Sequence, residues 1–280
     1  MPELPEVETV RIGLEKVLVG RKLAKVQIMR PNLRFPFPHG FQDALKNKRV
    51  IRLYRRGKFL LVDIDSSQTL VVHLGMSGRF KIYLSNPPDI EPHDHVLFEI
   101  EGGVNVRFND PRRFGFMDLL ETNKLADSNF LKNLGPEPLE NDFNGPELVK
   151  RLRSRRSPIK TVLLDQSVVA GLGNIYVSEA LFRAGLSPKR LAANILGSRA
   201  EALVLAIRNV LADAIAAGGS SLRDHRQPTG EIGYFQHYFS VYGRTGKACP
   251  ECICDIEKTG GIKRINQSGR STFYCARKQR

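Results

Sequence analysis

Hydrophobic residues near the start of the chain recur at helical spacing. These apolar positions, mostly three or four residues apart, are Val7, Val10, Leu14, Val17 and Leu18. The spacing places them on one face of a helix. Pro5 suits the first turn, where a backbone N–H would have no helical partner. The pattern therefore predicts a helix over residues 5–18.

From residue 22 to residue 120 the pattern changes to short runs rich in β-branched and aromatic residues, separated by Gly, Pro, Asn, Asp and Ser. The predicted strands are 25–29, 50–54, 59–64, 70–73, 80–84, 96–100 and 104–108. Gly102-Gly103, between the last two runs, indicates a hairpin. Many short strands in series predict a β-sandwich or a barrel, and we expect a sandwich.

The composition changes after about residue 125. A linker rich in Gly, Pro, Glu and Asn occupies 126–145, and helical patterns then cover 146–154, 158–167, 174–184 and 198–217. Residues 218–236 are polar and Gly-rich, and a loop this long in a compact protein is usually functional. We therefore expect an α+β protein. Its parts are a sandwich domain over 1–125, a helical domain over 146–236 and a C-terminal ribbon over 237–280.

The charge of the chain is strongly positive. The formal net charge is +14 and the pI about 9.8, which favours a polyanionic partner such as DNA. The alternative is a solvated basic surface that has no partner. A membrane surface fits less well, because the cations do not line one amphipathic helix. One basic run follows the helix predicted over 146–154, and we expect it to contact phosphates. It comprises Lys150, Arg151, Arg153, Arg155 and Arg156.

Targeting signals and membrane spans are not evident. No apolar run approaches the roughly 18 residues of a membrane helix, and residues 1–11 have no apolar segment typical of a signal peptide. We therefore expect a monomer in the bacterial cytoplasm, associated with the nucleoid through DNA. The four cysteines lie between residues 249 and 275. In such a compartment this clustering favours a metal site over disulfides.

The N-terminal residues can carry chemistry. Removal of Met1 would leave Pro2 with a free secondary amine, which titrates far below a lysine and is a nucleophile near neutral pH. Such an amine can attack the anomeric carbon of a nucleoside and expel the base, leaving an iminium that promotes strand cleavage by elimination. Glu3 is adjacent and can act as a general acid. The alternative is an ordinary helix start, with Pro and acids in the first turn.

Six blocks of the sequence resemble the formamidopyrimidine-DNA glycosylase family. They begin with Pro2-Glu3-Leu4-Pro5-Glu6 and end with Gly230-Glu231-Ile232-Gly233-Tyr234-Phe235-Gln236 followed by Val241-Tyr242-Gly243-Arg244. Between these lie 56–60, 73–79, 109–115 and 170–176. The matches run in order along nearly the whole chain. The resemblance implies base excision followed by β,δ-elimination, without a redox cofactor, on double-stranded DNA that contains oxidised bases or abasic sites.

The resemblance also implies roles for individual residues. Pro2 would form the Schiff base, Glu3 would act as the acid, and Glu6 would belong to the same pocket. Lys58 would assist β-elimination and contact a phosphate. Arg270, at the tip of the ribbon, would hold a phosphate and assist δ-elimination. An enzyme that acts on a base must flip it out of the stack.

Three further residues resemble the family's wedge, which fills the space that a flipped base leaves. They are Met76, Arg112 and Phe114, and without the resemblance Met76 and Phe114 would be taken for core residues. The resemblance implies DNA contacts at a wider set, which adds His73, His93, Arg156, Lys160 and Asn174. Residues 218–224 match the loop that recognises oxidised purines. A Gly-rich turn before Asn174 suits phosphate binding at a helix N-terminus, or a simple cap.

The cysteine pattern departs from the family. The family's ribbon has two Cys-x-x-Cys pairs, which supply the four ligands of a closed structural zinc site. Here Cys249 and Cys252 form one pair, but Cys275 is followed three residues later by Lys278. Cys254 or Asp255 could substitute as the fourth ligand. The alternative is a hairpin that folds without tightly bound metal.

The sequence thus predicts a repair enzyme that excises 8-oxoguanine and formamidopyrimidines through Pro2. Two other functions remain open at this point. One is an oxidised-pyrimidine glycosylase of the same superfamily, which would have a different loop after Gly218. The other is a non-catalytic DNA-binding protein that kept the fold, which would be expected to lack Pro2 or Glu3.

Overall fold

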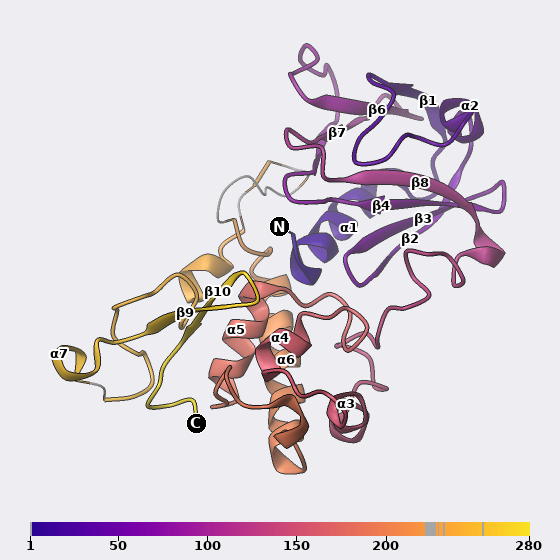
Figure 1. Ribbon diagram of the computed structural model, residues 1–280. Coiled ribbons are helices and arrows are strands. Elements are labelled where there is room, and N and C mark those ends of the chain that lie inside the picture. Colours follow the sequence, from indigo (N-terminus) through magenta and orange to yellow (C-terminus); the bar gives the residue numbers. More distant parts are fainter. Residues whose placement is uncertain (1, 222–227, 229, 232, 254) are drawn as a thin grey trace. The chain divides into compact units, whose positions relative to one another are not determined.

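The computed structural model describes residues 2–221, 228, 230–231, 233–253 and 255–280. The chain divides into two compact units (Figure 1). The first comprises 1–132 and 217–234, and the second comprises 133–216 and 235–280. The domain boundaries expected from sequence remain a prediction. No helix in the described part of the chain is both long and apolar enough to cross a bilayer.

The first unit begins with the predicted helix, α1 (Leu4–Leu18). Its apolar face is buried, and Pro5 lies in its first turn, as expected. The backbone N–H of Glu3 precedes the helix and donates to the side chain of Glu6 at 2.8 Å. This hydrogen bond satisfies a donor that the helix itself cannot pair and fixes the direction in which the chain enters.

Two antiparallel four-stranded sheets follow. One has the order β1 (Leu23–Ile28), β6 (Asp94–Ile100), β7 (Asn105–Asn109) and β5 (Arg79–Tyr83). The other has the order β2 (Val50–Arg56), β3 (Phe59–Ile64), β4 (Gln68–His73) and β8 (Phe116–Glu121). A short helix, α2 (Phe41–Leu45), packs near β1, and a 3₁₀ turn, η1 (Thr122–Lys124), follows β8.

The two sheets and α1 enclose one hydrophobic core, so the expected sandwich is confirmed. Its members include Leu14 from α1, Leu60 from β3 and Phe108 from β7, all nearly inaccessible to solvent. The hairpin expected at Gly102-Gly103 joins β6 to β7, and both glycines have positive φ. Strand β8 was not predicted from the sequence. Its residues do not alternate between apolar and polar, and those in its second half are half-buried or exposed.

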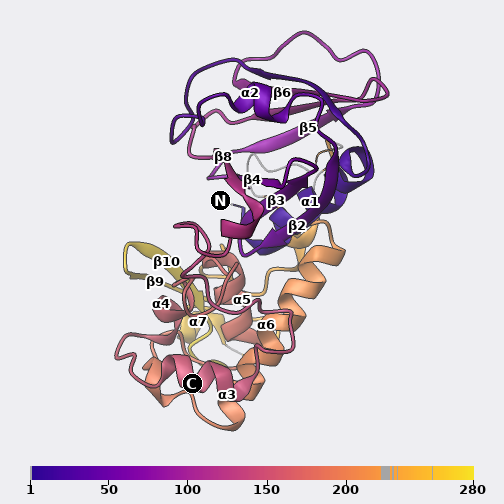
Figure 2. The same cartoon turned by 90° about the vertical axis from the view of Figure 1, so that its right-hand side faces the viewer.

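The second unit contains the predicted helices. They are α3 (Gly145–Leu152), α4 (Ile159–Leu163), α5 (Asn174–Arg183) and α6 (Ser198–Ala216), with 3₁₀ turns η2 (Ala192–Asn194) and η3 (Phe235–Tyr238). Helix α6 packs against both α3 and α5 (Figure 2). Asn144 caps α3 by accepting from the N–H of Glu147. Helix α4 is shorter than expected.

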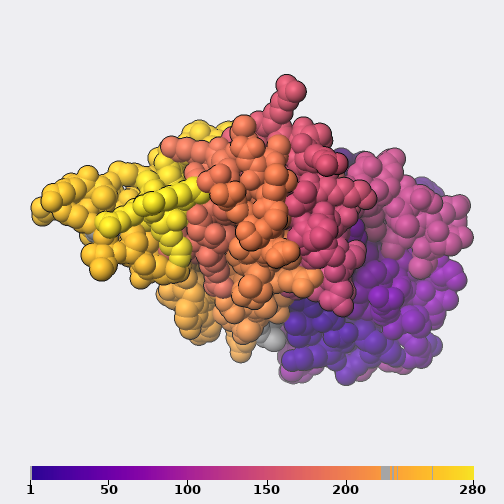
Figure 3. Space-filling model, turned by 90° about the horizontal axis from the view of Figure 1, so that it is seen from below, coloured from indigo at the N-terminus to yellow at the C-terminus, as the bar shows by residue number. Residues whose placement is uncertain are grey.

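The C-terminal ribbon completes the second unit. It consists of α7 (Ile256–Thr259) and the antiparallel pair β9 (Lys263–Gln267) and β10 (Arg270–Tyr274). A small core of its own joins Phe182 on α5 to Val241, Ile262 and Phe273. The ribbon, golden to yellow in Figure 3, forms one end of this unit. The expected α+β class, with a sandwich, a helical part and a terminal hairpin, is confirmed.

Candidate active site

Pro2 and Glu3 lie at the start of α1 and are both buried. Only 3% of Glu3 is exposed. Its carbonyl accepts the first helical hydrogen bond, from the N–H of Val7 at 3.1 Å. The helix that follows therefore anchors the two residues that the sequence predicts as nucleophile and acid.

The side chain of Glu6 connects this N-terminal segment to Ser220, which is far away in the sequence. One carboxylate oxygen accepts from the backbone N–H of Glu3, and the other accepts from the N–H and the hydroxyl of Ser220, at 2.8 and 2.9 Å. Gly219 has φ +79°, and a Cβ there would lie 3.3 Å from Glu6. The two segments thus approach closely enough to favour glycine. Glu6 is a positioning residue in this arrangement.

Lys58 lies in the turn between β2 and β3, directly after Gly57, whose φ is +58°. Only 7% of Lys58 is exposed. The next residue, Phe59, lies on β3 and is paired with His73 on the neighbouring strand β4. The sandwich therefore holds the lysine near the histidine, a proximity that the sequence separation of the two does not reveal.

His73 is kept neutral by its surroundings. Burial, then the charges of Lys58 and Arg34, lower its pKa to about 4. Its Nδ1 accepts from the N–H of Gly75 at 3.0 Å, and its ring stacks on Phe116. Because Nδ1 is an acceptor, the neutral ring carries its proton on Nε2. His73 can therefore donate one hydrogen bond without carrying a charge.

The candidate wedge residues are exposed, unlike core residues. Met76 is 40% exposed and Phe114 is 43% exposed. The guanidinium of Arg112 lies over the Phe114 ring, 4.8 Å from its centroid. Neither Met76 nor Phe114 therefore belongs to the hydrophobic core of the sandwich. The Phe114 ring attracts the Arg112 cation electrostatically, which favours this contact between the two side chains.

His93 lies in an exposed turn of the same unit. Its backbone adopts a positive φ of 72°, and its carbonyl accepts from the N–H of Asp110 at 3.1 Å. Its ring approaches that of His95, with centroids 6.1 Å apart. The turn presents His93 to solvent, where a phosphate could reach it.

In the second unit, Asn174 is the first residue of α5, and Gly173 precedes it as the cap. The Asn174 side chain donates to the carbonyl of Ser271 in the ribbon, at 3.0 Å. Arg270, the neighbour of Ser271, is exposed at the tip of the hairpin after Gly269. Helix α5 therefore braces the hairpin tip directly beside Arg270.

The other two basic candidates of the second unit differ in exposure. Arg156 is exposed after α3, whereas Lys160 on α4 is fully buried. A phosphate contact by Lys160 would require DNA to reach a buried ammonium group. Within the basic run, Arg151 pairs with Glu147 and Arg155 with Asp165.

Buried Glu179 on α5 ties this helix to the segment that leads into the ribbon. Its carboxylate accepts from the N–H groups of Ser240, Val241 and Tyr242, at 2.8–3.0 Å. Burial nevertheless raises the pKa of Glu179, against the lowering effect of these hydrogen bonds. The second unit thus contains its own buried positioning carboxylate.

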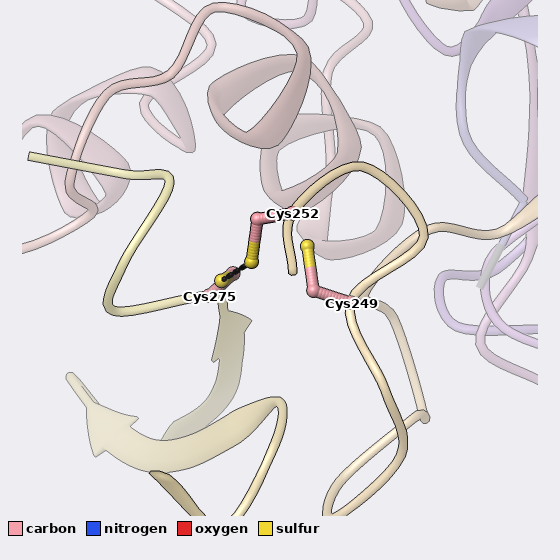
Figure 4. Close-up of side chains that lie close together, drawn as sticks. All are labelled: Cys249, Cys252 and Cys275. Carbon is pink, nitrogen blue, oxygen red and sulfur yellow. Dashed lines mark hydrogen bonds between the residues drawn. The ribbon is translucent and has the colours of Figure 1, made fainter. Parts of the chain in front are cut away.

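Three cysteines converge in the ribbon (Figure 4). The sulfurs of Cys249, Cys252 and Cys275 all lie within 4.8 Å of one another, close enough to hold one metal ion. The Cys252 and Cys275 sulfurs are 3.6 Å apart, near the roughly 3.8 Å expected between thiolates on a tetrahedral zinc. These three residues therefore fit part of a zinc site.

The residue at the expected place of the fourth zinc ligand is Lys278, and its side chain has other partners. Lys278 forms an ion pair with Glu251, and its ammonium lies over the Phe182 ring, 4.4 Å from the centroid. Asp255 caps α7 by accepting from the N–H groups of Glu257 and Lys258. Cys254, the other substitute expected from sequence, lies outside the described residues.

Models of two domains, described as the formamidopyrimidine-DNA glycosylase N-terminal domain and H2TH domain, match residues 1–117 and 134–226. The chain belongs to the formamidopyrimidine-DNA glycosylase family. A family member from Rhodospirillum rubrum is 57% identical, and the match covers all of both chains. Membership makes this chain a base-excision repair glycosylase with the lyase activity of its family.

Solved structures agree with this membership. The formamidopyrimidine-DNA glycosylase of Thermus thermophilus, named MutM, has a TM-score of 0.86 and 39% identity, over 99% of this chain and 98% of that one. A complex of the Lactococcus lactis Fpg with DNA that contains an abasic site has a TM-score of 0.88 and 34% identity, over 99% of both chains.

Sequence reasoning about this glycosylase missed the side chains that support the candidate residues. Ser77 and Asp110 lie inside two of the motif blocks, yet no local pattern pairs residues so far apart in sequence. The expected lesion loop is described only in part. Gly218 and Gly219 have positive φ, whereas residues 222–224 lie outside the described part of the chain.

Proposed function

We propose that this glycosylase excises oxidised purines, 8-oxoguanine and formamidopyrimidines, from duplex DNA, with the Pro2 amine as the nucleophile. The observation that carries the proposal is the placement of Pro2 beside the buried acid Glu3 at the start of α1. The family name, and the abasic DNA in the Lactococcus lactis complex, support damaged DNA as the substrate.

The chemistry follows from an amine and an acid in one place. The unprotonated Pro2 nitrogen attacks C1′ of the damaged nucleotide, and the glycosidic bond breaks as the base leaves with a proton. The C1′–O4′ bond of the sugar then opens to give the iminium, and Glu3 delivers a proton to O4′ or to the base in these steps. The resulting iminium acidifies the C2′ proton. Loss of that proton expels the 3′ phosphate, and a second elimination expels the 5′ phosphate. Lys58 and Arg270 are proposed to assist these two steps.

Borohydride trapping on duplex DNA with one 8-oxoguanine opposite cytosine tests the proposal. Reduction should convert the iminium to a stable amine, and peptide mapping should place the DNA adduct on Pro2 as the N-terminal residue. An adduct on Lys58 would overturn the assignment. Weak action on 8-oxoguanine with strong action on oxidised pyrimidines would favour the pyrimidine-specific alternative, and no adduct would favour a non-catalytic binding protein.

We further propose that the exposed residues of both units bind the duplex. Met76, Arg112 and Phe114 would fill the space that the flipped nucleotide leaves, and Arg112 would read the opposite base. The candidates for phosphate contacts are His73, His93, Arg156, Lys160 and Asn174. The net charge of +14 supports such contacts. We expect the enzyme to act as a monomer on DNA in the bacterial cytoplasm.

For the ribbon we propose one structural zinc ion, held weakly or through a substitute fourth ligand, while Arg270 still contacts DNA. The three converging sulfurs support a metal, and the ion pair of Lys278 with Glu251 opposes a fourth protein ligand at that position. A zinc ion there would cross-link the hairpin to the segment before it and would take no part in the reaction.

A further inference from the structure

A fully buried carboxylate, Asp110, joins the two loops that carry the proposed wedge. We propose that Ser77 and Asp110 are positioning residues, which hold Met76, Arg112 and Phe114 in the geometry needed to replace a flipped nucleotide. This inference rests on the wedge function proposed above and assigns the side chains on which that function depends.

The sheet brings the two loops together first. Loop 74–78 leaves β4, loop 110–115 leads into β8, and these strands are neighbours in one sheet (Figure 1). The last residue of β4, His73, pairs with the first residue of β8, Phe116. The start of loop 74–78 and the end of loop 110–115 are therefore adjacent, at one edge of the sandwich.

A chain of hydrogen bonds then connects the loops. The Arg112 N–H donates to the Ser77 hydroxyl at 3.1 Å, and that hydroxyl donates to one oxygen of Asp110 at 2.5 Å. The other oxygen of Asp110 accepts from the N–H of Gly115 at 2.8 Å. Each bond ends at a wedge residue or directly beside one, because Ser77 follows Met76 and Gly115 follows Phe114.

The Asp110 backbone extends the same network to His93. Its N–H donates to the His93 carbonyl at 3.1 Å, and its carbonyl lies 2.9 Å from Nε2 of buried His95. One residue thus connects the wedge with a further candidate DNA contact. Both loops lie beyond the ends of the strands that they connect.

Close backbone contact leaves the loops little freedom to rearrange. A Cβ on Gly75 would lie 2.3 Å from the backbone nitrogen of Gly115, and a Cβ on Gly115 would lie 3.1 Å from the Asp110 carboxylate. Met76 and Phe114 are 40% and 43% exposed, so packing covers only part of each side chain. The polar network therefore adds a constraint on the backbone from which these two side chains project.

Ser77→Ala is the sharpest test, because it removes a single oxygen atom and breaks both bonds to the hydroxyl. We expect the preference for cytosine over adenine opposite 8-oxoguanine to fall about 2- to 10-fold, the range for one or two net hydrogen bonds. The fluorescence rise of 2-aminopurine beside the lesion, which reports unstacking, should fall in parallel. Asp110→Asn, which has one acceptor oxygen instead of two, should act in the same direction.

Thr69→Val is the matched control. It also removes a buried hydroxyl that donates to a carboxylate, that of Asp63 at 2.7 Å, but on β4 away from the wedge. Thermal unfolding measures the stability loss in both variants. Base preference and 2-aminopurine signal should change only in Ser77→Ala, and equal behaviour of the two variants would overturn the positioning role.

Arg112→Ala, assayed in parallel, separates the two proposals. If it leaves the base preference unchanged, the proposed reading of the opposite base is wrong, and the positioning role loses its basis. If Arg112→Ala changes the preference while Ser77→Ala does not, the wedge stands and only the inference about Ser77 and Asp110 fails.

Discussion

The start of α1 and the C-terminal ribbon are both candidate functional regions, and they differ in how completely they are built. Both oxygens of Glu6 accept hydrogen bonds, and Pro2 and Glu3 are buried beside it. In the ribbon three cysteine sulfurs converge, while Lys278 pairs with Glu251 at the position expected for the fourth ligand.

The difference reflects what each region must do. Attack on C1′ needs a nucleophile and an acid at defined positions, so a missing group there removes the reaction. The proposed task of the ribbon is to hold Arg270, and packing can do part of that work. Tyr242 and Phe273 pack edge to face at 5.0 Å, within the small core that includes Phe182. A ribbon with such a core depends less on a metal ion to hold its hairpin in place.

Glu3→Gln should have the largest effect and would test the N-terminal region directly. Excision of 8-oxoguanine should fall by about 10²–10⁴, the usual contribution of a general acid. Cleavage of DNA with a ready-made abasic site should fall far less, because the amine can form the iminium without that acid. Single-turnover rates on both substrates measure the ratio.

Glu8→Gln is the control for this substitution. Glu8 is on the same helix, but it pairs with Arg55 and Arg11 instead. Both activities should stay near the parent value in this variant. Equal loss of both activities in a folded Glu3→Gln enzyme would contradict the assigned role.

Lowering the pH should decrease the free energy of unfolding of the first unit, because protonation of His73 is disfavoured in the folded state. Its folded pKa of about 4 lies below the ordinary value of 6.5, so between these values the unfolded chain binds more protons. The stabilisation that comes from keeping His73 neutral is fully present above pH 6.5 and is lost as the pH falls to about 4. It amounts to about 3 kcal/mol at most, from the size of the shift.

Urea unfolding of the parent and His73→Asn between pH 4 and pH 7 measures this contribution. The difference between the two proteins should depend on pH, whereas replacing the exposed His39 by Asn should leave the parent profile unchanged. The raised pKa of Glu179 has the opposite sign, because protonation there favours the folded second unit. A pH-independent difference for His73→Asn would show that its folded pKa is not lowered.

Lys278→Cys should convert the ribbon into a complete site. A fourth thiolate closes the tetrahedral set, so zinc affinity should rise at least about tenfold. Metal content after dialysis against a moderate chelator, under reducing conditions, reports the change. Lys278→Met, which removes the ammonium but adds no ligand strong enough for zinc, is the control. A parent protein that already retains one zinc under this treatment would show that its own site is complete.

Arg270→Ala should have the smallest of these effects, since it removes one phosphate contact. Binding of abasic-site DNA should weaken severalfold, and the slope of log affinity against log salt should decrease by about 0.9. The product of δ-elimination should decrease relative to that of β-elimination. Lys258→Ala removes an exposed cation on α7 of the same ribbon and should leave both readouts unchanged. An Arg270→Ala enzyme that cuts like the parent would contradict the role of the hairpin.

Local patterns in the sequence predicted most of the elements, although they missed β8, and the motif blocks supplied the candidate chemistry. Helix α1 follows from the spacing of Val7, Val10 and Leu14, and the hairpin of β6 and β7 follows from two adjacent glycines. The roles of Pro2 and Arg270 came from ordered motif blocks. These features depend on residues that are close in sequence, where periodicity and turn chemistry act directly.

Tertiary structure decided everything that depends on distant residues meeting. The sandwich buries His73 and places it near Lys58, both of which lower the pKa of His73. It also brings Ser77 to Asp110. Folding also turns Lys278 toward Glu251 and Phe182, which a count of cysteines could not reveal. The physical reason is that burial, charge and hydrogen bonding act through space, whereas sequence patterns report only neighbours along the chain.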